Sequence, residues 1–333
     1  MIEAFHKAIS TGNQNTYKFA LGRAVIEEFG NDRIIPLIAL AGRFADYYFK
    51  NHQEFKLRET NNPSQDPTAT LILRKLIKYR YGDRIPPKRM PKKFREDFAE
   101  KIVNPPSGWG HSVFTYVLPC WQGAAMNTRG YYEYPRSGSN DFFEFSIDDG
   151  LIILTNDFVA TLDHHKSTLL SMVILEWARF MEKFNHTPNL ISKLSPKKPY
   201  RRISKFRSIF KETPALKIGL CHLCKQPLLK ADFTLDHMIP FDYVYTDDLW
   251  NLVPAHRKCN SKKGARVGSD RMIRKLIERN NVLWDLRGSA AQKWIQSSAE
   301  SANGLESNII LVANAAKKAG FEKVTDQEIN SYS

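Results

Sequence analysis

Apolar residues recur at helical spacing through most of the first hundred residues of the chain. Between residues 15 and 103 they return every three or four positions, most clearly at residues 34–49 and 71–81. This period gathers apolar side chains on one face of a helix, where they can pack against other helices. We therefore expect a helical bundle in this region.

The pattern changes in the middle of the chain. Residues 112–118 are rich in β-branched and aromatic side chains and predict a strand. Residues 142–154 predict a hairpin that turns at Asp148-Asp149-Gly150. Asn156 is expected to cap a long amphipathic helix that extends to Met181. The centre should therefore be a small antiparallel sheet with a helix packed on it.

Residues 187–217 lack a clear apolar stripe and contain Pro196 and Pro199 among many cations. We interpret residues 191–217 as a basic linker between domains. Its candidate phosphate-binding residues are Lys197, Lys198, Arg201, Arg202, Lys205 and Arg207. A solvated connector is an equally good interpretation of this charge. Helical patterns at residues 272–286, 290–302 and 308–319 then predict a C-terminal helical segment.

The overall charge favours a polyanionic partner. The chain has 49 Lys and Arg against 35 Asp and Glu, a net charge of +14, and a hydrophobic content of 42% that excludes a disordered protein. It contains no apolar run of about 18 residues, and its first residues lack the order of a signal peptide. We expect a cytoplasmic protein that does not contact membranes.

Three of the four cysteines lie in one window with histidines. Cys221-x-x-Cys224 and His256-x-x-Cys259 form two ligand pairs separated by a long insertion. Two such pairs supply the four ligands of tetrahedral Zn²⁺, so we predict a closed, structural Cys₃His site. Buried cysteines that meet this spacing by chance are the alternative. His222 is a competing ligand, which we expect to be exposed.

Between the two ligand pairs, the pattern predicts a strand, a second strand and a short helix. The first strand ends in Asp236-His237, and residues 248–253 form the second. Pro254 suits the first turn of a helix that Gly264 can terminate. Asn260 and Lys263, three residues apart, should share one helical face.

Residues 220–267 resemble the HNH (ββα-metal) endonuclease family. Asp236-His237, Asn251 and Asn260 stand where that family has its Asp-His pair, central Asn and final His or Asn. The chain differs from zinc-containing members in having His256 where Cys is commoner. The resemblance implies cleavage of nucleic acid, with double-stranded DNA as the expected substrate, and a prokaryotic role in restriction, phage defence or mobile elements.

The chemistry of these side chains agrees with phosphodiester hydrolysis. His237 is the candidate base, because imidazole titrates near neutral pH. Asp236 and Asn260 offer oxygen ligands for catalytic Mg²⁺ or Mn²⁺. Asn251 is expected to hold the loop after His237, although it could instead cap the helix. Lys263 is either a contact to the phosphate or a solvated lysine at the helix end.

Together these features predict an α+β protein with four parts. Residues 1–190 form an N-terminal helical and sheet region that selects the target or binds a protein partner, and residues 191–217 the basic linker. Residues 218–268 form the nuclease domain and residues 269–333 the C-terminal helices. Two alternatives are a nuclease subunit that works only in a larger complex and a zinc module that binds nucleic acid without cutting it.

Overall fold

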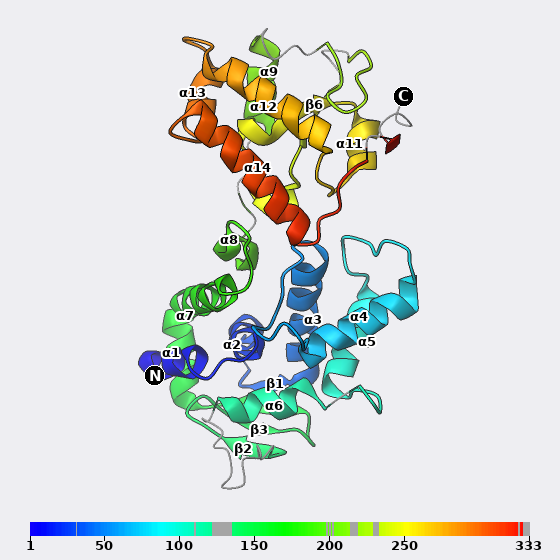
Figure 1. Ribbon diagram of the computed structural model, residues 1–333. Helices are drawn as coiled ribbons and strands as arrows, with labels where there is room; N and C mark the ends of the chain where they lie inside the picture. The colour runs from blue at the N-terminus through cyan, green and yellow to red at the C-terminus, as the bar shows by residue number, and fades with distance from the viewer. Residues whose placement is uncertain are drawn as a thin grey trace. The chain divides into compact units, whose positions relative to one another are not determined.

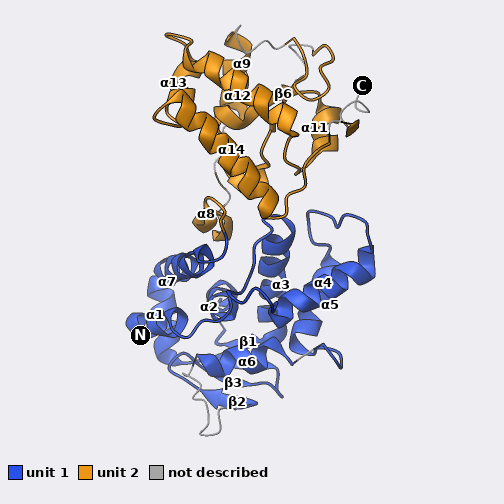
Figure 2. Cartoon of the chain, in the orientation of Figure 1, with its two compact units in different colours: residues 1–185 blue, residues 186–333 orange. Residues whose placement is uncertain are grey.

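The computed structural model describes residues 1–30, 32–109, 111–121, 135–197, 199, 201, 203–213, 219–228, 233–325 and 327–328. The chain is a mixed α+β protein, as predicted, with two compact units: residues 1–185 and residues 186–333 (Figure 2). Candidate phosphate contacts Lys198 and Arg202 lie outside the described residues. Among the described helices, none has both the length and the apolar character needed to cross a bilayer.

The first unit combines a helical bundle with a four-stranded antiparallel sheet (Figure 1). Its helices are α1 (Ile2–Ser10), α2 (Tyr17–Glu28), α3 (Leu37–Gln53), α4 (Thr68–Tyr81), α5 (Lys92–Val103), α6 (Val113–Cys120) and α7 (Asn156–Glu182). Its strands are β1 (Ile34–Pro36), β2 (Ser137–Ser139), β3 (Phe143–Ser146) and β4 (Leu151–Leu154). The strand order is β1-β4-β3-β2, so that Ile152 of β4 pairs with Ile35 on one side and Phe145 on the other, all three buried.

The predicted hairpin is confirmed as β3 and β4, but two neighbouring predictions are wrong. The cap of α7 is Thr155 and not Asn156, because the Thr155 hydroxyl accepts a hydrogen bond from the backbone N–H of Phe158. The segment predicted as a strand at residues 112–118 lies largely in helix α6, for which Ser112 is the N-cap. Val113, Phe114, Val117 and Leu118 are all buried, at the spacing of one helical face, so packing overrides their β propensity.

The second unit places a small β-hairpin among short and medium helices. Its helices are α8 (Leu190–Leu194), α9 (Ile203–Glu212), α10 (Phe241–Val244), α11 (Arg257–Lys263), α12 (Asp270–Trp284), α13 (Ala290–Gln296) and α14 (Ala302–Lys318), with a 3₁₀ turn, η2, at Leu249–Asn251. Strands β5 (Thr234–His237) and β6 (Leu252–Ala255) pair antiparallel. One hydrophobic cluster contains buried residues from α9, the hairpin, α12, α13 and α14.

The segment interpreted as a linker is therefore partly folded into this unit. Phe206, Ile209 and Phe210 of α9 are buried, and the Phe206 ring packs edge-on against Trp294 of α13 at 5.1 Å. The expectation that no apolar stripe crosses residues 187–217 is wrong at α9. This stripe has only three residues and is interrupted by cations, so the sequence pattern does not predict it.

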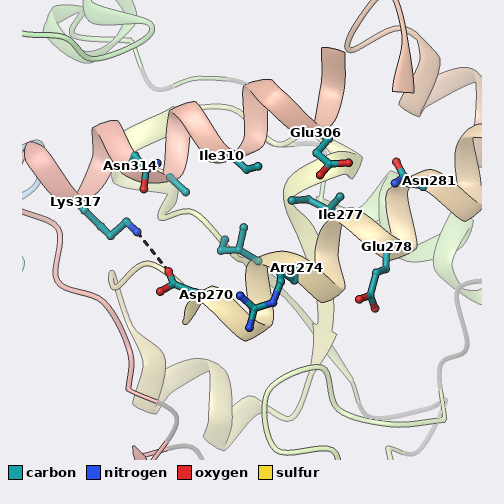
Figure 3. A pocket seen from close by; sticks show the side chains of 11 residues that line it. Asp270, Arg274, Ile277, Glu278, Asn281, Glu306, Ile310, Asn314 and Lys317 are labelled. Carbon is teal, nitrogen blue, oxygen red and sulfur yellow. Dashed lines mark hydrogen bonds and ion pairs between the residues drawn. The ribbon is translucent and has the colours of Figure 1, made fainter. Parts of the chain in front are cut away.

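Helices α12 and α14 line an open pocket of about 550 Å³ (Figure 3). Its lining residues all come from these two helices and mix apolar side chains, such as Ile277 and Ile310, with charged ones. Asp270 and Lys317 form an ion pair at one end of it, 3.4 Å apart. The pocket is thus separate from the hairpin and helix that carry the predicted chemistry.

Candidate functional site

The four predicted zinc ligands come together in the second unit. The ligand atoms of Cys221, Cys224, His256 and Cys259 all lie within 4.8 Å of one another. Nδ1 of His256 is 3.4 Å from Cys224 Sγ and 3.7 Å from Cys259 Sγ. Zinc–sulfur and zinc–nitrogen bonds of normal length place neighbouring tetrahedral ligands about 3.6 Å apart. The cluster therefore has the size and donor set of a site for a metal ion such as zinc.

The second nitrogen of His256 supports this assignment. Nε2 lies 2.9 Å from the carbonyl oxygen of Pro227, which can only accept a hydrogen bond, so Nε2 carries the proton and Nδ1 has its lone pair free for a metal. His222 does not join the cluster. It is half-buried and not exposed as expected, with Nε2 3.4 Å from the Met272 carbonyl oxygen.

The hairpin and helix α11 follow the predicted order of strand, strand and helix. Thr234 pairs with Ala255 and His237 with Leu252 across the hairpin. Gly264 ends α11 with a φ of +57°, a conformation that glycine adopts without steric cost. Pro254 does not begin the helix as predicted, because it lies inside β6, and the helix starts two residues after Ala255.

Asp236 lies one residue before the end of β5, in a buried position. It is only 5% exposed, and this burial raises the pKa of its carboxyl group, against the lowering influence of the Lys263 ammonium. Lys263 Nζ lies 3.4 Å from both carboxylate oxygens. Within the described part of the chain, however, Oδ2 of Asp236 accepts no hydrogen bond. A buried carboxylate oxygen with a lone pair left over is suited to a second cation.

Lys263 is an internal residue and not a solvated one. It is 1% exposed, and its ammonium donates to the carbonyl oxygen of His237 at 2.7 Å as well as to Asp236. The alternative of a solvated lysine at the helix end is therefore wrong. Through these contacts the Lys263 side chain holds α11 against the end of β5.

Asn260 lies on the same side of the hairpin as Asp236. Its Nδ2 donates to Thr234 Oγ1 at 3.2 Å. Thr234 and Asp236 are two residues apart on β5 and so share one face of the strand. Because Asn260 contacts one and Lys263 the other, α11 runs along this face with its amide and ammonium groups beside the strand.

His237 is oriented by a carboxylate that the sequence analysis missed. Nε2 of His237 lies 3.0 Å from Oδ1 of Asp247, whose side chain is fully buried. A carboxylate only accepts, so Nε2 carries the proton and Nδ1 is left as the basic nitrogen. In the described ranges, no hydrogen-bond partner faces Nδ1. This is the tautomer that a general base requires.

Arg201 completes the surroundings of His237. Its Nε donates to the second oxygen of Asp247 at 2.9 Å, and its guanidinium stacks 3.9 Å from the centre of the Phe241 ring. Phe241 in turn packs edge-on against His237 at 5.3 Å. A residue predicted to bind phosphate from a linker is thus held beside the candidate base. No local signal distinguishes Asp247 from its neighbour Asp248 in the sequence.

The other described linker cations differ in their surroundings. Lys205 lies over the Trp294 ring at 4.5 Å, and Arg207 lies over the Phe233 ring at 4.7 Å. Lys197 is exposed. A cation stacked on an aromatic ring can still contact a phosphate, but the stacking by itself accounts for the positions of Lys205 and Arg207.

Asn251 holds the loop that follows His237. It is fully buried; its side-chain oxygen accepts from the Ile239 N–H at 2.7 Å, and its Nδ2 donates to the Ile239 carbonyl at 2.8 Å. The backbone just before Asn251 is held in turn by Arg279 of α12, which donates to the carbonyl oxygens of Leu249 and Trp250. Burial lowers the pKa of Arg279 to about 9.

Replacing Asn251 with alanine should therefore reduce stability. Two backbone groups of Ile239 would lose their partners in a buried position, at a cost of about 2–4 kcal/mol in the free energy of unfolding. Chemical denaturation of the purified variant measures this effect. Asn308→Ala, on the exposed side of α14, is the matched control and should change stability by less than about 0.5 kcal/mol. Equal stability of the two variants would contradict the positioning role.

The comparisons with known proteins identify the same segment. No curated protein and no solved structure matches the chain significantly. One family model does match, that of the HNH endonucleases, over residues 221–266. The match begins at the first cysteine of the metal cluster and ends just after α11, and so covers the hairpin, His237 and Asn260. Residues 221–266 of this chain therefore match the HNH endonuclease family, and the Cys₃His cluster within them is consistent with a zinc-containing HNH module.

Proposed function

We propose that the chain is a metal-dependent endonuclease that hydrolyses phosphodiester bonds of double-stranded DNA at Asp236, His237 and Asn260. The observation that carries this proposal is the hydrogen bond between His237 Nε2 and Asp247, which leaves Nδ1 as a base. A zinc module that only binds nucleic acid has no need of a histidine held in this tautomer. The family-based roles in restriction and phage defence remain predictions.

In this proposal, each side chain around the hairpin has a separate role in hydrolysis. His237 Nδ1 takes the proton from the attacking water, and Asp247 stabilises the imidazolium that results. Asp236 and Asn260 would hold Mg²⁺ or Mn²⁺, for which Oδ2 of Asp236 is suited, because it accepts no hydrogen bond among the described residues. When bound, such an ion neutralises charge that develops on the phosphate and the leaving oxygen. Lys263 keeps the strand end and α11 together, and the Cys₃His cluster would hold structural zinc.

The direct test is cleavage of plasmid DNA by the purified chain. Cleavage should require added Mg²⁺ or Mn²⁺, while zinc stays bound in the protein. Asn260→Ala should lower the single-turnover cleavage rate by at least about 10²-fold at low Mg²⁺, because one of the two protein ligands is lost. Part of this rate should return at high Mn²⁺.

Ser261→Ala, at the next position on α11, is the control and should cut at the wild-type rate. A wild-type chain that binds DNA but leaves it intact at every metal concentration would reject the enzyme. That result would favour the alternative of a binding module. Cleavage that appears only after addition of a cell extract would instead point to a subunit of a larger complex.

A further inference from the structure

A short stretch of the first unit carries a large excess of positive charge. Between Arg74 and Lys93 there are nine cations and one acidic residue, which accounts for more than half of the net charge of +14. This stretch lies outside both the HNH module and the basic segment at residues 191–217. Its charge therefore needs an explanation of its own.

The cations lie where two packed helices meet a stiff loop. Helix α4 ends at Tyr81, α5 starts at Lys92, and the two helices contact each other (Figure 1). The connecting residues include Pro86, Pro87 and Pro91, which restrict the backbone. Eight exposed side chains form what we call the α4–α5 surface: Lys78, Tyr79, Arg84, Ile85, Lys88, Arg89, Lys92 and Lys93.

Several of these cations have no counter-charge in the part of the chain that the structure describes. Among the described residues, Lys78, Arg89 and Lys93 form no ion pair with a carboxylate. By contrast, Arg80 lies 3.5 Å from Asp97, and Lys92 lies 3.9 Å from Glu96. The free cations of the α4–α5 surface are thus available to an external anion.

The position of two lysines argues against a purely structural role. Lys92 and Lys93 occupy the first turn of α5, which contains no acidic residue and has no side-chain cap. The positive end of a helix dipole disfavours cations at this place. Lysines elsewhere on the helix would make the protein equally soluble. The arrangement therefore favours a bound anion, whose attraction to the two lysines offsets their repulsion by the helix dipole.

Two large apolar side chains stand among these cations. Tyr79 is 91% exposed and Ile85 is 92% exposed. Phosphate-binding surfaces of DNA-binding proteins combine cations that contact the backbone with apolar side chains that contact bases or enter a groove. An inorganic anion or a single phosphate would leave Tyr79 and Ile85 without a partner.

We infer that the α4–α5 surface is a second DNA-binding site, which contacts the phosphate backbone of a duplex through its lysines and arginines and a groove through Tyr79 and Ile85. The inference rests on the proposed function in taking DNA as the partner. The N-terminal unit would therefore bind the DNA substrate. Each phosphate contact releases condensed counterions, so this binding depends steeply on salt.

The test is a salt titration of affinity for a short labelled duplex, measured by fluorescence anisotropy without Mg²⁺ and in a His237→Ala background. A variant with Lys78, Arg84, Arg89 and Lys93 each changed to Gln should reduce the log-log salt slope by about 3–4. Its affinity at about 0.1 M salt should fall roughly 10²- to 10³-fold. The control changes Lys7, Lys183, Arg287 and Lys318 to Gln, which removes the same net charge from exposed positions elsewhere.

A second pair of variants separates the two kinds of contact. Tyr79→Ser and Ile85→Ser should weaken binding but leave the salt slope unchanged, because neither side chain neutralises a phosphate. Equal slopes and affinities for the four-residue variant and its control would overturn the inference.

Binding to vesicles of phosphatidylserine and phosphatidylcholine that depends on the four cations, with DNA affinity unaffected, would also overturn it in favour of a membrane surface. A chain that binds DNA through this surface but never cuts it would reject the nuclease and leave the surface assignment standing.

Discussion

Changing His237 to alanine is expected to lower the rate of DNA cleavage by at least about 10²-fold, with DNA affinity almost unchanged. A general base acts in the transition state and contributes little to binding of the substrate, so the loss should appear in the single-turnover rate and not in the dissociation constant. Quench-flow cleavage and fluorescence anisotropy measure the two quantities separately. Cleavage at the wild-type rate would remove His237 from the mechanism.

The substitution Asp247→Asn tests whether the hydrogen bond to Asp247 keeps Nδ1 of His237 available as the base. The carboxylate accepts from His237 on one oxygen and from Arg201 on the other, whereas an amide has only one oxygen. If the amide oxygen stays with Arg201, the amide N–H faces His237 Nε2 and the proton moves to Nδ1, so the base is lost. We expect a fall in rate of about 10- to 10³-fold with little change in the dissociation constant.

The neighbouring substitution Asp248→Asn is the matched control. Asp248 accepts a hydrogen bond from Thr246 and not from His237, so its variant should retain nearly full activity. Asp247→Glu should recover part of the rate, because it restores a carboxylate. Equal rates for the Asp247→Asn and Asp248→Asn variants would contradict the orienting role of Asp247.

Changing Cys221 to serine is expected to empty the zinc site and unfold much of the second unit. The cluster joins the turn at Cys221 and Cys224 to the start of α11, and structural zinc contributes roughly 10 kcal/mol or more to the folding of small modules. Elemental analysis should find about one zinc ion in the wild type and almost none in the variant. Thermal unfolding should show the loss of stability directly.

The fourth cysteine supplies the control for this experiment. Cys120 is half-buried in the first unit and outside the metal cluster. Cys120→Ser should keep its zinc and unfold at nearly the wild-type temperature. A Cys221→Ser protein that retains both zinc and stability would show that the cluster has no structural role.

The parts of the site that could be predicted from sequence are those fixed by short-range spacing. Paired ligands at x-x intervals, the strand that ends in Asp236-His237 and the glycine that ends α11 each carry a local signal. These signals sufficed to place the metal cluster, the hairpin and the helix. Pro254 is an exception: its fixed φ fits an edge strand as well as a first helical turn, so the residue alone does not distinguish the two.

The parts that could not be predicted depend on contacts between residues far apart in the chain. Asp247 meets His237 only because the hairpin and α10 bring the two together, and Arg201 joins them from the segment interpreted as a linker. Residues 112–118 carry β-branched and aromatic side chains, yet their burial pattern in α6 is set by the core they enter. Local propensity does not contain this information.

Helix α12 covers backbone groups of the hairpin segment, and this contact limits how the HNH segment could be moved into another protein. Arg279 is half-buried, and its guanidinium donates hydrogen bonds to three backbone carbonyl oxygens, those of Leu249, Trp250 and Leu252. The family match ends well before Arg279, at residue 266. A graft of the matched segment onto another protein would leave those carbonyl groups and their apolar neighbours without cover. The smallest transferable part of this chain that contains the HNH segment is therefore the second unit as a whole, because α12 belongs to that unit and covers the hairpin segment.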